Sequence, residues 1–564
     1  MIYCNLDDHK IFHKIIIVNP SQLVDGNKVW VKAVEFSPSF IKVEVIKIIG
    51  HRDDIGIDIQ SIVFGHGIEP EFSDEIIDYA NNLSKEITQD EKKRRIDLTH
   101  LPIVTIDPST SKDLDDAICV VKEENQYRLY VSIADVSHYV RPNTILDEEA
   151  KKRGTSIYLI DKVIPMLPHI LSNDICSLNP EEETLTMTCE MVIKLDGSFG
   201  EIKVYDSIIN SRKRFSYDEV NNYFKDNLKM DNISHKIYEM LDTSCELYEI
   251  LRPMLFKRGY IDFEIKEPKI LLDDNGKVID VVSYNRGKAQ MMIENFMIAA
   301  NEATTLFYND KFKDKDFVYR IHDKPSETKL AYFQAESKKM NFITKGDVFK
   351  IEPHTISNWI SQNNFVEPKK TILNKLLLKT MVKAEYSTKN IGHFGLASSN
   401  YTHFTSPIRR YPDILVHRIF KMLLTDTKNY TVNDKIQLFD TLSLDCQNAT
   451  KKEIQSVEIE REVNSLKYAE FMSTKIGEFY EGIVTHITGN GIFVELTNLI
   501  EGMVRLSNIK INDFFNYNEQ ENILIGMKSK IQISFGTRVK IKVMNVNIQL
   551  RQIDFSLLEI ISTI

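Results

Sequence analysis

The segment IVTIDPSTSKDLDD, residues 103–116, is the most informative stretch of the 564-residue sequence. An apolar run ends at Asp107, a Pro-Ser-Thr-Ser turn folds the chain back, and the run AICVV after Asp116 has the composition of a buried strand. The segment therefore predicts two strands joined by a turn that brings four carboxylates together. They belong to Asp107, Asp113, Asp115 and Asp116.

Four carboxylates close together at one bend are stable only with a neutralising charge, such as a bound cation. Like charges at close range repel and raise each other's proton affinity, so a divalent ion stabilises such a cluster. Oxygen ligands without His or Cys favour Mg²⁺ or Mn²⁺. A pair of such ions activates a water and stabilises the leaving 3′ oxygen, which points to metal-assisted hydrolysis of a nucleic acid. A solvated acidic turn stays open as an alternative, whereas an EF-hand would need a glycine and a closing glutamate that are missing.

The hydrophobic pattern of the rest of the sequence predicts a multidomain α+β protein. It has a central mixed α/β core flanked by small OB-type β-barrels. The run from Val29 to Gly50 alternates apolar and polar residues around a Ser-Pro-Ser turn, which predicts a barrel hairpin. We expect only β-structure up to about residue 65. The predicted parts are a barrel at 1–70, a polar helical connector at 71–97, the core at 98–425, an amphipathic helical extension packed on the core at 426–474, and a five-stranded OB barrel at 475–560.

Composition excludes several classes of protein. The six cysteines form no CxxC pair, which argues against a zinc ribbon and fits a reducing cytoplasm. No apolar stretch is long enough to span a bilayer, and the start MIYCNLDDHK lacks the apolar core of a signal peptide. No GxxxxGK[ST] motif supports ATP use. The net charge of −10 means that a nucleic acid must be bound by local basic patches. We expect a cytoplasmic monomer that uses neither membrane nor ATP.

At this point the sequence resembles the exoribonucleases of the ribonuclease II and ribonuclease R type. Their signature D-x5-D-x-D-D is matched by the four aspartates of the segment quoted above. The sequences VIPMLPHILSNDICSLNP and SPIRRYPD are more similar to ribonuclease R than to ribonuclease II. Further matching stretches are SIADVSHYV at 132–140, TSIYLIDKVIPMLPHILSNDICSLNP at 155–180, RGYIDFE at 258–264, YRIHDKP at 319–325 and HFTSPIRRYPDILVHR at 403–418.

The resemblance implies an activity and a domain layout. It implies magnesium-dependent 3′-to-5′ hydrolysis of single-stranded RNA, taken into a narrow channel, to nucleoside 5′-monophosphates. Structured RNA with a 3′ overhang stays open as a further substrate. The N-terminal barrel would be a cold-shock-type OB domain, with room for one where the family usually has two. The C-terminal barrel would be the family's RNA-binding OB domain.

The resemblance also implies roles for single residues. The four aspartates would hold magnesium, with Asp115 most directly tied to cleavage. Arg409 would contact phosphate at the scissile bond, as a forked guanidinium is suited to do. Tyr158 would stack near the 3′-terminal nucleotide, Glu460 would meet that nucleotide, and Tyr217 would lie along the RNA channel. His138 and His322 are expected to be hydrogen-bonded structural histidines.

Two sites are less well defined. Where the family has a second aromatic clamp, this sequence has Ile270, with Phe263 as a nearby substitute for RNA binding. Phe493 of the C-terminal barrel would bind RNA, or would instead be barrel core.

An alternative function is a non-catalytic RNA-binding protein on the same fold. Such a protein would be expected to lose carboxylates that repel one another without metal, and all four are present, which favours catalysis.

Overall fold

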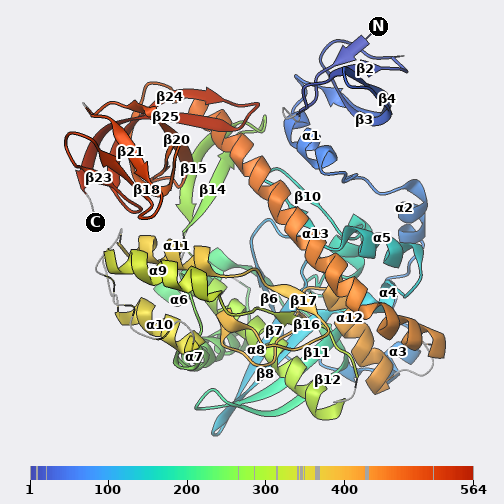
Figure 1. Ribbon diagram of the computed structural model, residues 1–564. Helices are drawn as coiled ribbons and strands as arrows, with labels where there is room; N and C mark the ends of the chain where they lie inside the picture. The colour runs from blue at the N-terminus through green and yellow to red at the C-terminus, as the bar shows by residue number, and fades with distance from the viewer. Residues whose placement is uncertain are drawn as a thin grey trace.

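The computed structural model describes residues 2–7, 11–20, 22–230, 232–263, 266–284, 286–312, 315–339, 342, 344, 347, 350–362, 369–425, 431–511 and 513–562. Figure 1 shows an N-terminal sheet, a large central body and a C-terminal barrel. A 42-residue helix, α13 (Val432–Ser473), runs from the central body to the barrel. Patterning predicted this helix, because apolar side chains recur at three- and four-residue steps.

In the described residues, the N-terminal part is a four-stranded sheet with the order β1-β2-β4-β3. The predicted hairpin is present, because β3 and β4 pair antiparallel on either side of the Ser-Pro-Ser turn. The strands are β1 (Ile2–Cys4), β2 (Lys14–Ile17), β3 (Asn27–Phe36) and β4 (Phe40–His51).

The expectation of only β-structure up to residue 65 is wrong, because Ile57–Gly65 forms helix α1. That expectation extended the β-pattern of the Val29–Gly50 hairpin too far along the chain. In the helix, Ile59 and Val63 lie one turn apart and pack with Ile459 and Val463 of α13. Tertiary packing therefore overrides the local pattern and seats the N-terminal part on the long helix.

The connector contains helices α2 (Asp74–Asn81) and α3 (Gln89–Arg94), not one continuous helix. Each begins at a residue whose side-chain oxygen accepts a backbone hydrogen bond, Ser73 for α2 and Thr88 for α3. After α3 the chain enters the central sheet as its edge strand, β5 (Ile96–Asp97).

The central sheet has the strand order β5-β12-β11-β8-β7. Its neighbours pair antiparallel, except that β5 runs parallel to β12. Helices α7 (His235–Arg258) and α8 (Lys288–Lys311) pack on the sheet and share its hydrophobic core. The remaining strands are β7 (Asp116–Glu123), β8 (Gln126–Ala134), β11 (Glu183–Lys194) and β12 (Phe199–Asn210).

Shorter elements surround the sheet. A parallel pair, β6 (Thr105–Asp107) with β13 (Arg214–Ser216), leads into α6 (Tyr217–Asp226). The others are α4 (Val136–Tyr139), α5 (Ile145–Arg153), β9 (Ile157–Tyr158), β10 (Val163–Ile164), the π-helix η1 (Leu171–Ile175), β14 (Glu267–Leu272), β15 (Val278–Tyr284), β16 (Tyr319–Ile321), α9 (Glu327–Lys339), α10 (Pro353–Gln362), α11 (Lys369–Thr380), β17 (Glu385–Ser387), η3 (Phe394–Leu396), α12 (Tyr411–Phe420) and η4 (Lys421–Thr425).

The C-terminal part is a closed barrel with the order β18-β19-β20-β25-β24, in agreement with the predicted OB barrel. Phe471 and Met472 of α13 and Val281 of β15 join its hydrophobic core, so the barrel is attached to the rest of the molecule (Figure 1). Its strands are β18 (Phe479–Thr488), β19 (Gly491–Leu496), β20 (Glu501–Ile509), β24 (Arg538–Asn547) and β25 (Gln552–Ser562), and a side sheet comprises β21 (Phe515–Asn518), β22 (Ile523–Gly526) and β23 (Gln532–Ile533).

Candidate active site

The acidic bend has the predicted local structure. Asp107 is the last residue of β6, and Asp116 is the first residue of β7, where it lies opposite Ile133 of β8. A bridge between Val104 and Ile118 places the two segments side by side. The ends of the bend are therefore fixed by backbone pairing, and the turn between them carries the remaining aspartates.

Asp115 is fixed by one carboxylate oxygen. Its Oδ1 accepts a hydrogen bond of 2.8 Å from the backbone N–H of Ile408. Its Oδ2 lies 3.7 Å from Nε of Arg409. Burial raises the pKa of Asp115 well above its ordinary value, against the opposing effect of Arg409. The carboxylate thus faces the loop that contains SPIRRYPD.

The other carboxylates interact electrostatically with Asp115 and with one another. Burial, followed by the charge of Asp116, raises the pKa of Asp107 to about 8. Burial raises the pKa of Asp116 to about 6. Asp113 adds to the upward shift at both Asp107 and Asp115. Asp107, Asp115 and Asp116 therefore resist ionisation, and Asp113 lies close enough to influence two of them.

The donor set fits a hard divalent cation, although it does not form a closed ligand shell. Among the residues that the structure describes, no three His, Cys, Asp or Glu side chains converge as one metal site. The buried Oδ2 atoms of Asp107 and Asp115 nevertheless have no hydrogen-bond partner there. Buried carboxylate oxygens in this state are costly unless a cation binds them.

Tyr158 and Glu460 lie beside the bend. The Tyr158 hydroxyl donates a hydrogen bond of 2.8 Å to Oδ2 of Asp113, and the side chain stays partly exposed. The backbone N–H of Tyr158 donates to Oε1 of Glu460 at 3.2 Å. Burial raises the pKa of Glu460. The long helix α13 thus contributes a carboxylate next to the aromatic residue of β9.

Tyr217 also belongs to this neighbourhood. It is the first residue of α6, whose N-terminus is fixed by a capping box between Ser216 and Glu219. Burial raises the pKa of its hydroxyl, with further contributions from Asp116 and Asp107.

Three other predicted positions lie elsewhere. Phe263 packs half-buried against the hydrophobic cluster of α9, α10 and α11. Ile270 of β14 packs against the core of the C-terminal barrel. Phe493 is half-buried on β19, where its ring lies 5.9 Å from that of His486, while its neighbours Ile492 and Val494 fill the barrel.

The loop that carries Arg409 is held by residues that sequence analysis did not single out. The carbonyl oxygen of Arg409 accepts hydrogen bonds of 3.0 Å from the Thr155 hydroxyl and from the Ser156 N–H. Nη2 of Arg409 donates to Oγ of Ser406 at 3.1 Å. The buried Asp413 accepts from the Ser406 N–H at 2.8 Å. Asp413 ends the motif SPIRRYPD, which was the available signal.

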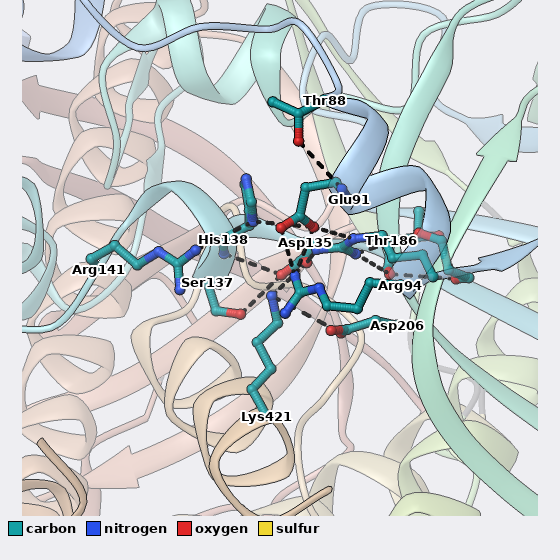
Figure 2. Close-up of polar contacts among 12 residues, drawn as sticks. Thr88, Glu91, Arg94, Asp135, Ser137, His138, Arg141, Thr186, Asp206 and Lys421 are labelled. Carbon is teal, nitrogen blue, oxygen red and sulfur yellow. Dashed lines mark hydrogen bonds and ion pairs between the residues drawn. The ribbon is translucent and has the colours of Figure 1, made fainter. Parts of the chain in front are cut away.

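Figure 2 shows a buried cluster of charged residues around Asp135. Asp135 follows the last residue of β8, Ala134, whose N–H donates to the carbonyl oxygen of Asp115 at 2.9 Å. Oδ2 of Asp135 accepts from Nη2 of Arg95 at 2.6 Å and from Nζ of Lys421 at 2.5 Å. Despite burial, these two cations hold the pKa of Asp135 well below its ordinary value. The cluster joins the connector, the central sheet and η4.

Family models cover most of the chain. A cold shock domain matches residues 3–73, an RNB domain matches residues 95–426, and an S1 RNA binding domain matches residues 473–558. An RNB core with an acidic bend, flanked by two OB-type domains, defines a metal-dependent ribonuclease of the RNB class.

Comparison with known proteins shows to which family of RNB-class ribonucleases the chain is similar. Ribonuclease R of Ureaplasma parvum is 44% identical over 565 residues, covering 98% of this chain and 78% of that protein. Mycoplasma genitalium RNase R in complex with ribose methylated single-stranded RNA matches with a TM-score of 0.93 and 33% identity over 97% of this chain and 85% of that one. The same enzyme with double-stranded RNA matches with a TM-score of 0.87 and 31% identity over 98% and 93%. The chain belongs to the ribonuclease R family.

The predicted resemblance and fold class are thereby confirmed. The described helices include none with both the length and the apolar character needed to cross a bilayer.

Proposed function

We propose that the four aspartates hold Mg²⁺, with Mn²⁺ as a substitute, and that RNA is hydrolysed there to nucleoside 5′-monophosphates. As a member of the ribonuclease R family, the chain is a 3′-to-5′ exoribonuclease that acts on RNA. One observation carries the assignment of the site. Asp115 is buried among three further aspartates, with Oδ1 bonded to the Ile408 N–H and Oδ2 facing Arg409 without a hydrogen bond.

The residues around the bend suit phosphodiester cleavage. Divalent ions, when bound, lower the pKa of a water and stabilise the leaving oxygen. The side chain of Arg409 is 43% exposed, so its guanidinium can bind phosphate oxygens and stabilise negative charge in the transition state. The hydroxyl of Ser406 and the carboxylate of Asp115 orient that guanidinium.

Tyr158 and Glu460 are suited to the 3′-terminal nucleotide. The Tyr158 ring is partly exposed, and stacking on it needs no particular base. The Glu460 carboxylate can accept hydrogen bonds from ribose hydroxyls, which are donors that DNA lacks at the 2′ position. Tyr217 would lie along the RNA channel, and Phe263 and Phe493 would make further contacts with the RNA strand.

The same comparison supports the proposed substrate range, and features of the sequence support the proposed setting. The match to M. genitalium RNase R in complex with double-stranded RNA supports structured RNA with a 3′ overhang as a substrate besides single strands. We further infer a cytoplasmic monomer, and the six dispersed cysteines without a CxxC pair support the reducing compartment. Action without ATP is supported by the lack of a phosphate-binding GxxxxGK[ST] motif in the sequence.

Asp115→Asn tests the site. Asparagine retains an oxygen that can accept from the Ile408 N–H, so the fold is expected to persist while the charge is lost. The substrate is a 5′-labelled single strand, alone or annealed to leave a 3′ overhang. With magnesium, the natural protein should shorten both from the 3′ end. The variant should lose more than about 100-fold in rate, with RNA binding by fluorescence anisotropy changed less than about threefold.

Asp440→Asn is the matched control, because Asp440 is exposed on α13. It should behave as the natural protein does. Normal cleavage by Asp115→Asn would refute the site, and absence of laddering by the natural protein with either metal would favour the non-catalytic alternative.

A further inference from the structure

One guanidinium lies over the turn between Asp107 and Asp113. It belongs to Arg214, the first residue of β13. Its Nη2 atom donates to backbone carbonyl oxygens of the turn, namely those of Pro108 at 3.4 Å, Ser109 at 2.9 Å and Ser111 at 2.5 Å.

This contact removes a local electrostatic conflict. Several carbonyl oxygens that converge on one side of a turn present the negative ends of their dipoles to one another. The same turn carries the carboxylates of the acidic bend, which adds to the negative potential. The guanidinium brings a fixed positive charge to these oxygens, which share the two N–H donors of its Nη2 atom at the end of a side chain longer than that of lysine.

A second residue holds the other half of the turn. The buried Ser177 donates from Oγ to the carbonyl oxygen of Lys112 at 2.8 Å and accepts from the N–H of Leu114 at 3.1 Å. Arg214 binds the first half and Ser177 the second. The conformation of the turn is therefore set by residues that lie far from it in the sequence.

The backbone of β13 delivers Arg214 to this place. The strand runs parallel to β6, with Arg214 opposite Thr105 and Ser216 opposite Asp107. The next residue, Tyr217, begins α6 beside the aspartates. One short segment thus carries both a guanidinium to the turn and an aromatic ring to the bend.

We propose that Arg214 is a positioning residue for cleavage, which holds turn 108–112 in the shape that brings Asp107 to the other three aspartates. In this way Arg214 sets the affinity of the bend for its divalent cation. The inference rests on the proposed function, in which these carboxylates bind the metal. An arginine that only stabilised the fold would alter the melting temperature without altering metal affinity.

Arg214→Gln tests this role, with Mn²⁺ as the probe for binding and Mg²⁺ for activity. Isothermal titration of the RNA-free protein should show Mn²⁺ bound about 10- to 100-fold more weakly than by the natural protein, the usual loss when a residue behind the ligands is removed. The Mg²⁺ concentration for half-maximal cleavage should rise by a similar factor. KM for single-stranded RNA should change by less than about twofold, because Arg214 does not touch RNA in this role.

Arg212→Gln is the matched control. Arg212 lies two residues earlier, is exposed, and donates to the carbonyl oxygen of Thr99 instead of the turn. It should bind Mn²⁺ as the natural protein does. Equal Mn²⁺ affinity in folded Arg214→Gln and Arg212→Gln would overturn the proposal.

Two further variants separate the possible failures. If Arg214→Gln does not fold, Arg214→Lys is measured instead, because it keeps the charge but has a shorter side chain without the Nη2 donor that contacts the turn. Its Mn²⁺ affinity should fall at least about threefold, and unchanged affinity would overturn the inference.

Asp115→Asn is titrated in parallel. Normal Mn²⁺ binding and normal cleavage by that variant would refute the proposed function itself, whereas loss of both there with an unaffected Arg214→Gln would refute only the role of Arg214.

Discussion

At the scale of single residues, Asp115 shows how a carboxylate can be both fixed and available. One oxygen is held by the N–H of Ile408, from a loop almost 300 positions later in the chain. The other oxygen has no hydrogen bond within the described structure. A side chain held in this way keeps its orientation while leaving a lone pair free for a ligand.

Tyr158 permits a test that separates stacking from hydrogen bonding. Tyr158→Ala removes the ring, so binding of single-stranded RNA should weaken by about 1–3 kcal/mol, which is roughly 5- to 150-fold. Tyr158→Phe keeps the ring and loses only the hydrogen bond to Asp113, so its affinity should stay within about twofold. Anisotropy in an Asp115→Asn background would measure both without degradation. Equal affinities for the two variants would count against stacking.

Sequence analysis could propose site residues only where a motif is local. The four aspartates lie within ten positions, and their spacing alone predicted that they meet. Arg214 was missed because its partners are more than 100 positions away and are backbone carbonyl oxygens, which leave no trace in the side-chain pattern. The contact between Tyr158 and Glu460 spans 302 positions, and only the family resemblance indicated it.

At the scale of elements, the ion cluster around Asp135 joins segments that are distant in the chain. Lys421 is 2% exposed and also lies 4.0 Å from a carboxylate oxygen of Asp206. Burial lowers the pKa of Lys421, whereas Asp135 and Asp206 raise it. Taking one partner from such a buried cluster leaves an uncompensated charge, which usually costs more than the intact pair contributes.

Lys421→Met should therefore destabilise the protein by about 3–5 kcal/mol. The measurement is the urea midpoint of the transition that reports on the central domain. Lys152→Met is the control, because Lys152 is 72% exposed in its pair with Glu149 and should contribute less than about 1 kcal/mol. Similar small losses in both variants would show that the cluster around Asp135 does not support the fold.

The elements themselves were predicted with uneven success. Periodicity predicted α13 and alternation predicted the C-terminal barrel, because both patterns repeat over many residues. Helix α1 was missed because the N-terminal part was expected to contain only β-structure, and the buried face of this short helix is defined by packing against α13. The connector was predicted as polar and helical without bounds for its helices, which are set by the caps at Ser73 and Thr88.

At the scale of the whole molecule, buried neutral histidines make stability depend on pH. Burial lowers the pKa of His393 to about 3 and that of His138 to about 4. Among the described histidines, burial lowers the pKa of His322, His403 and His417 as well. His322 is hydrogen-bonded through both ring nitrogens, as expected for a structural histidine.

These histidines should make the protein less stable as the pH falls below about 6.5. The folded state binds fewer protons than the unfolded state between the lowered pKa and the ordinary value, so stability rises with pH in that window. At pH 5.5 His393 and His138, whose pKa values are about 3 and about 4, each cost roughly 1.4 kcal/mol. With excess Mg²⁺, which on our proposal keeps the aspartates ionised, the melting temperature should fall at least about 5 °C from pH 7 to 5.5.

His417→Gln and His100→Gln provide the comparison for this pH effect. His417 is fully buried, so its replacement should remove part of the pH dependence of the melting temperature. His100 is exposed, so its replacement should leave that dependence unchanged. A flat melting temperature down to pH 5.5 in the natural protein would contradict the assignment of these groups as neutral.

The 42-residue helix α13 constrains how the sequence of this protein can change in evolution. It packs on α1 and on β24, and it contributes Glu460 next to Tyr158. An inserted or deleted residue in its middle would rotate everything beyond it by about 100° and shift it by about 1.5 Å. The parts of the protein that pack on α13 before and after the change would then no longer face their partners together. Descendants of this gene should accumulate substitutions along α13 while keeping its length constant.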